Sequence, residues 1–121
     1  MRMVAVTAAA LALTVSRAGA NELDDAHRSA ISGRDTYWTC LAQEYNAEGN
    51  KQMSEQDFNR HIAEACPSER QSFRVALVDY LSLQFPNVDV DAHMTSANNA
   101  IALAQKDVTT AFARHKAAAS K

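Results

Sequence analysis

Residues 54–81, SEQDFNRHIAEACPSERQSFRVALVDYL, contain the clearest helix boundaries in the 121-residue chain. Ser54 with Asp57 three residues later is close to the capping-box pattern of a helix start. Pro67 ends that helix, because proline lacks the N–H of a helix interior and clashes with the preceding turn. The pattern predicts an amphipathic helix from Ser54 to Cys66.

A second helix follows at once in the same stretch. Ser68-Glu69-Arg70-Gln71 matches a full capping box, and Pro86 limits the helix to about Gln84. Between these bounds, apolar residues recur at the spacing of one helix face, namely Phe73, Ala76, Leu77, Tyr80 and Leu81.

Toward the N-terminus, residues 22–47 predict a long helix with a wide apolar stripe. The stripe consists of Leu23, Ala26, Ala30, Tyr37, Leu41 and Tyr45. Gly33 interrupts it, and we expect Gly33 to mark a kink or to separate a loose first part from a helix that starts near Asp35. Gly49 is the expected C-terminal cap.

Toward the C-terminus, a fourth helix is predicted from Asp89 or Asp91 to about Lys116. Its apolar residues alternate at three- and four-residue steps, a narrow seam that suits lengthwise packing against other helices. The seam consists of Met94, Ala97, Ile101, Ala104, Val108, Ala111 and His115. Residues 116–121 are expected to form a frayed tail. Four amphipathic helices with short links predict an all-α fold, a small helical bundle.

The first 20 residues have the three parts of a Sec-type signal peptide. A basic start at Arg2 precedes an uncharged apolar run, VAVTAAALALTV, at residues 4–15, and an Ala-Gly-Ala end predicts cleavage between Ala20 and Asn21. The run is shorter than the roughly 20 apolar residues of a membrane span, so no stable membrane anchor is expected after cleavage. We therefore expect residues 21–121 to form a single domain that is periplasmic or secreted.

The two cysteines, Cys40 and Cys66, are expected to form a disulfide, because an even cysteine count is typical of an exported chain with a disulfide framework. A redox pair is usually spaced C-x-x-C, and a zinc site needs more ligands at set spacing. By loop entropy alone, the crosslink should stabilise the domain by about 3 kcal/mol.

Charge limits the classes of partner. Without Arg2 and Arg17, ten Lys and Arg remain against 14 Asp and Glu, a net charge of −4. There is no basic patch, so a nucleic-acid partner is not expected. No nucleophile elbow or phosphate-binding glycine loop occurs in the sequence, and no cofactor is expected.

Two polar clusters leave a metal site open as an alternative. Asp57, His61 and Glu64 share one face of the predicted second helix, and Asp89, Asp91 and His93 lie together at the predicted start of the fourth. Carboxylates and imidazole can bind a divalent ion. A solvated helix face is the preferred explanation of the first cluster, and helix capping is the preferred explanation of the second.

The pattern Tyr37-x-x-Cys40 followed by Ala65-Cys66-x-x-Glu69-Arg70-x-x-Phe73 resembles small uncharacterised exported α-helical proteins of Gram-negative bacteria. The resemblance covers roughly residues 37–81 and implies a periplasmic helical protein, with no activity and no site residues assigned. The seam of the fourth helix and the lack of a catalytic motif favour a non-enzymatic protein that binds another protein through a helix face. The alternative is a small-ligand or divalent-metal-binding bundle, and an enzyme comes third.

Overall fold

The computed structural model describes residues 17–120 and is helical throughout, apart from short links. The elements are α1 (Arg17–Asn46), the 3₁₀ helix η1 (Glu48–Gln52), α2 (Glu55–Glu64), α3 (Pro67–Gln84) and α4 (Val90–Ala119). The predicted all-α bundle of four helices is confirmed. None of the helices in the described part is both long enough and apolar enough to cross a membrane.

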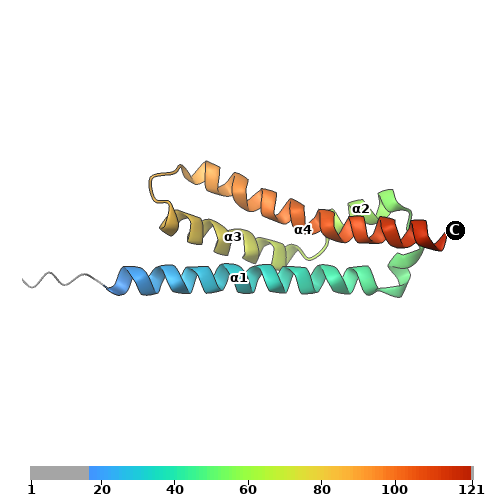
Figure 1. The fold of residues 1–121 in the computed structure, drawn as a ribbon, viewed down its shortest axis with the longest axis horizontal. Coiled ribbons are helices and arrows are strands. Elements are labelled where there is room, and N and C mark those ends of the chain that lie inside the picture. Colours follow the sequence, from blue (N-terminus) through green and yellow to red (C-terminus); the bar gives the residue numbers. More distant parts are fainter. Residues whose placement is uncertain (1–16, 121) are drawn as a thin grey trace, which may run out of the picture.

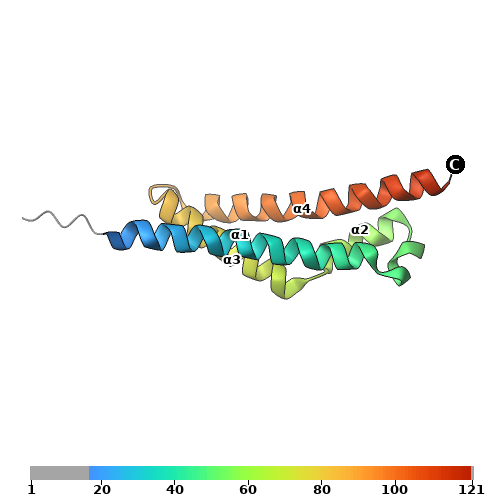
Figure 2. The same ribbon diagram turned by 60° about the horizontal axis from the view of Figure 1, so that its bottom comes forward.

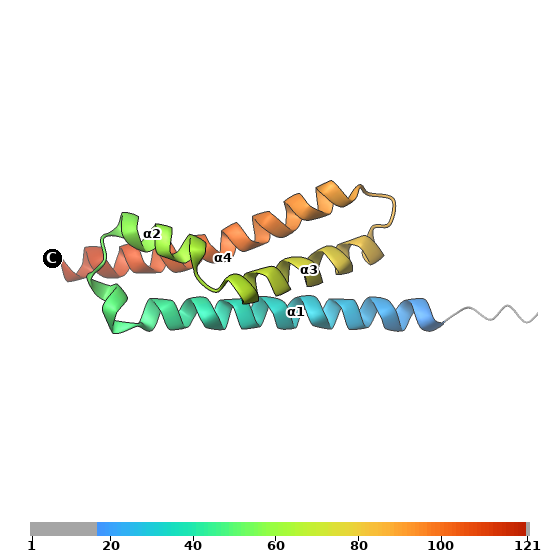
Figure 3. The ribbon, with the colours of Figure 1, turned by 180° about the vertical axis from the view of Figure 1, so that it is seen from behind.

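The bundle is elongated, and its two long helices, α1 and α4, run in the same direction along it (Figure 1). The shorter α2 and α3 follow each other end to end and run in the opposite direction (Figures 2 and 3). α3 packs against α1 and α4 in the half where α1 begins, and α2 contacts α4 in the half where α4 ends. Each half of the bundle is therefore built on the two long helices and one short helix.

The chain changes from α2 to α3 within two residues. Cys66 has a left-handed backbone, with φ of 56°, and is the N-cap of α3 without making a side-chain capping bond. Pro67 is the first residue of α3, a position that suits proline because its fixed φ is helical and its missing N–H is not needed there. The prediction that Ser68 caps this helix is therefore wrong: Ser68 already lies in the first turn. The predicted end at Gln84 is confirmed.

The predicted disulfide is present and joins α1 to this junction. Cys40 and Cys66 are bonded, with their Cα atoms 6.1 Å apart. Cys66 lies just beyond α2, which ends at Glu64, rather than being its last residue. The crosslink thus fixes the break between two helices against the middle of a third.

Gly33 and Gly49 do not act as predicted. Gly33 neither kinks nor divides α1. A Cβ at this position would lie 3.1 Å from the Cα of Phe73, so Gly33 allows α3 to approach the α1 backbone closely. Gly49 is not a C-terminal cap of α1, because it lies inside η1, and no glycine in the described residues has a positive φ.

The core lies where the helices meet, with Tyr37, Leu41, Phe58 and Ile62 as its largest fully buried side chains. On α4, the middle of the predicted seam is buried: Ala97, Ile101, Ala104 and Val108. The ends of the seam are wrong. Met94, Ala111 and His115 are exposed, whereas His93 and Phe112 are buried. A straight helix drifts about 20° per heptad from a 3.5-residue repeat. A seam of three heptads therefore faces away from the core at its ends.

The remaining predictions concern the C-terminal tail and the N-terminal signal peptide. α4 continues through Ala119, so residues 116–119 of the expected frayed tail are helical. Residues 1–16, which hold most of the predicted signal peptide, lie outside the described residues. The predicted cleavage position between Ala20 and Asn21 lies within α1.

Candidate functional site

The first candidate metal cluster, Asp57, His61 and Glu64, does not come together as a ligand set. Asp57 forms an exposed ion pair with Arg60, at 2.5 Å. Glu64 is exposed at the end of α2. His61 instead turns to α1, where its Nε2 lies 2.7 Å from an oxygen of Glu44. The shared helix face that the sequence indicated is thus divided between solvent and a contact with another helix.

The contact between His61 and Glu44 ties α2 to the end of α1. Asn50 of η1 adds to it by donating from Nδ2 to the backbone oxygen of Glu44, at 2.9 Å, and to its carboxylate, at 3.0 Å. The hydrogen bond from His61 lowers the pKa of Glu44, with smaller help from Asn50 and from the charge of His61, and partial burial opposes the shift. The polar group therefore closes the turn between the two helices, and it offers one imidazole and one carboxylate rather than a full ligand set.

The second candidate metal cluster is also separated. His93 is buried, and its Nε2 donates to the backbone oxygen of Phe85 at the end of α3, at 3.1 Å. Asp89 is the N-cap of α4, and its backbone oxygen accepts from the N–H groups of Ala92 and His93. Asp91 is exposed in the first turn. His93 thus ties the first turn of α4 to the end of α3, and both carboxylates remain in solvent.

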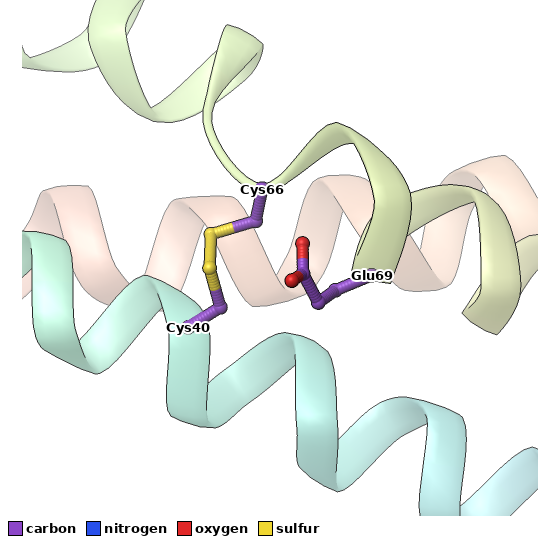
Figure 4. A group of neighbouring side chains, drawn as sticks. All are labelled: Cys40, Cys66 and Glu69. Carbon is purple, nitrogen blue, oxygen red and sulfur yellow. A yellow bond between two sulfur atoms is a disulfide. The ribbon is translucent and has the colours of Figure 1, made fainter.

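Within residues 17–120, one group of three potential ligand side chains lies close together: Cys40, Cys66 and Glu69, with ligand atoms within 4.8 Å of one another. Figure 4 shows the Glu69 carboxylate directed toward the disulfide. Because both sulfur atoms are bonded to each other, neither is available as a thiolate ligand. This group is a crosslink with an acidic neighbour.

A broad concave surface lies between α1 and α3, and we call it the α1–α3 groove. Its main part has a volume of about 1060 Å³ and is open to solvent along its length. α1 contributes Glu22, Ala26 and Ser29, and α3 contributes residues between Pro67 and Leu83. A second hollow continues it toward Gly33 and Thr36 and shares Ser29 and Ser72 with the first. Neither α2 nor α4 lines either hollow.

The walls of the α1–α3 groove follow a coiled-coil period. On α1 the lining positions include 22, 26, 29, 33 and 36, with Arg28 and Ser32 beside them, and on α3 they include 68, 72, 75, 79 and 82. Steps of four and three residues keep one side of a helix facing a parallel or antiparallel neighbour over two heptads. Most of these side chains are short: Ala, Ser, Gly or Thr. Two apolar side chains in the groove, Val75 and Leu83, are 50% and 40% exposed.

Little in the amino-acid sequence indicates this groove. Its serines and threonines look like an ordinary solvated helix face, and its alanines are easily assigned to the core. The available signal was the second run of three- and four-residue steps on each helix, alongside the apolar stripe. That run predicts a groove only once α1 and α3 are known to be neighbours.

Comparison with known proteins returns no match: no protein-family model, no curated protein and no solved structure matches the chain.

Proposed function

We propose that the protein is an exported, non-enzymatic binding protein that holds a helix of a partner protein in the α1–α3 groove. The observation that supports this most directly is the groove itself, a solvent-open channel of about 1060 Å³ between two helices with coiled-coil spacing on both walls. A helix laid into such a channel buries its own apolar face against two helices at once.

The disulfide supports the location. A bond between Cys40 and Cys66 fits an oxidising compartment outside the cytoplasm, because cytoplasmic thiols are kept reduced. Export by the predicted signal peptide would deliver the chain there. Intact mass of protein from the native periplasm tests both points: the expected species begins at Asn21 and gains two hydrogens on reduction, whereas a chain retaining Met1, or two free thiols, contradicts the proposal.

Site-specific photocrosslinking in the native host tests the binding function. A photoreactive residue is placed at Val75 in the groove and, in a second strain, at Leu103 on α4, which is 62% exposed and serves as the matched apolar control. We expect a discrete protein adduct from Val75 that is absent from Leu103. Adding Ser29→Trp, which fills the groove from α1, should abolish that adduct.

Two results would overturn the proposed function. Equal adducts from both positions would indicate non-specific contact with any exposed apolar side chain. An adduct from Val75 that persists unchanged with Ser29→Trp would show that the partner does not lie in the α1–α3 groove.

A further inference from the structure

The charges around the α1–α3 groove are arranged in a definite order along it. Glu22 and Asp79 line the end nearest the start of α1. Arg28 and Glu69 line the second hollow. Asp35 and Glu69 line a third, smaller hollow that continues the same line to the disulfide. The two ends of the groove are thus acidic, and a single arginine lies between them.

Three of these four carboxylates form no ion pair within the described part of the chain. Its ion pairs engage Asp35 with Arg34, but none includes Glu22, Glu69 or Asp79. A helix laid over these carboxylates would remove water from them, and an unpaired carboxylate that loses water costs free energy. A partner with positive charge at both ends of the groove avoids this cost and gains complementary attraction.

The spacing of the acidic ends sets the pattern required on the partner. Glu22 and Asp35 are 13 residues apart on α1, which is about 20 Å at a rise of 1.5 Å per residue. A partner helix in lengthwise packing covers that distance in about two heptads. Its positive residues must therefore lie about two heptads apart, with an uncharged or acidic residue opposite Arg28.

The same charges argue against a second copy of this chain as the occupant. In a symmetric dimer through this face, a parallel arrangement sets Glu22 and Asp79 against the same residues of the other copy. An antiparallel arrangement sets that acidic end against Glu69 and Asp35. Both arrangements place like charges together, which is unfavourable in an interface.

From these observations, and resting on the proposed function, we infer that the α1–α3 groove selects an amphipathic partner helix that carries two groups of Lys or Arg about two heptads apart. The short side chains of the groove let the partner backbone come close, as small residues do at tight helix contacts. Val75 and Leu83 supply the apolar contact, and the two acidic ends set the register.

Synthetic peptides test this inference with the chain purified from the periplasm. The probe is a 21-residue helical peptide with Leu and Ala on one face, two lysines at each end of that face and neutral residues elsewhere. Its control carries glutamates in place of the four lysines. We expect the lysine peptide to bind at least tenfold tighter at 20 mM NaCl, and the difference to shrink several-fold at 500 mM NaCl because salt screens exposed charges. Amide shifts should map to Ser29, Ser72 and Val75.

Charge reversal in the protein provides the second arm. Glu22→Lys/Asp79→Lys should remove the preference for the lysine peptide. The matched control, Glu64→Lys/Asp107→Lys, makes the same change in net charge at exposed positions on α2 and α4 and should retain the preference. Loss of the preference in both variants would show a general effect of net charge and overturn the inference.

The outcomes separate this inference from the proposed function. Groove shifts with equal affinity for both peptides would overturn charge selection and leave the groove as a helix-binding site. Shifts outside the groove, or no binding of either peptide, would overturn charge selection, and crosslinking at Val75 would then decide the proposed function by itself. Concentration-dependent dimerisation that displaces the lysine peptide would identify a second copy as the occupant and overturn the inference.

Discussion

Removing the disulfide should destabilise the domain by an amount that the size of its loop sets. Cys40 and Cys66 are 26 residues apart in sequence. The chain-entropy relation gives about 3.5 kcal/mol for a loop of this size at 25 °C. A domain of about 100 residues has a free energy of unfolding of roughly 5–15 kcal/mol, so the crosslink accounts for between a quarter and two thirds of the total. The expected fall in Tm is roughly 15–30 °C.

The variant Cys40→Ala/Cys66→Ala tests this value, because alanine avoids placing a hydroxyl at the buried Cys66 position. Urea unfolding followed by circular dichroism at 222 nm gives the free energy of unfolding and the m-value. The oxidised and reduced forms of the unmodified chain provide the control for packing changes, since both keep the sulfur atoms. A larger m-value is expected without the crosslink, because the unfolded chain then exposes more surface.

A difference below about 1 kcal/mol between the oxidised chain and the double variant would refute the reasoning. It would mean that the unfolded chain already holds α1 near the junction of α2 and α3 without the crosslink. A loss in the double variant that the reduced chain does not share would assign the effect to side-chain packing rather than to loop entropy.

Three further changes have expected outcomes. Gly33→Leu should lower the free energy of unfolding, measured in urea, by roughly 1–3 kcal/mol, because the leucine side chain must displace α3. Gly49→Ala, with open space around it, should change the free energy of unfolding by less than about 0.5 kcal/mol. Equal effects of the two substitutions would contradict the close approach of α3 to α1. Because folding lowers the pKa of Glu44, its carboxylate stabilises the fold above its ordinary value of 4.5 and loses this contribution as pH falls through the lower folded value. Glu44→Gln should therefore show a smaller drop in Tm than the unmodified chain between pH 5 and pH 3. Parallel plots of Tm against pH for the two proteins would show that folding does not lower the pKa of Glu44. Phe58→Ala removes a fully buried ring from an aromatic stack with a centroid separation of 3.8 Å and should cost about 3–5 kcal/mol; a thermal shift of only a few degrees would argue that the stack does not form.

Local sequence signals predicted the helix ends that depend on local chemistry. Ser54 caps α2 as expected, with its hydroxyl oxygen accepting from the N–H of Asp57 at 3.1 Å. Pro86 limits α3 as expected. The Ser68 cap failed because two local signals competed, and the proline at the first helical position prevailed over the capping box. The disulfide was predictable because the cysteine count and the signal-peptide pattern can both be read from the sequence alone.

Features that depend on which helices are neighbours were not predictable in the same way. Gly33 has the sequence signature of a helix break, and only the backbone of Phe73 across the interface gives it its true role. His61 and Glu44 lie 17 residues apart on different helices, so no helix-face pattern joins them. The α1–α3 groove is the largest such case, because each wall alone looks like a solvated helix face.

Signal-peptide cleavage at the predicted position would have an electrostatic consequence for α1. The predicted cleavage position between Ala20 and Asn21 lies within α1. A helix N-terminus is the positive end of the backbone dipole, so acidic side chains near it are favourable. Cleavage after Ala20 would remove Arg17 and bring Glu22, Asp24 and Asp25 into the new first turns, where negative side chains are stabilising. Removal of the leader would thus strengthen the first helix of the domain, at the end where the α1–α3 groove opens.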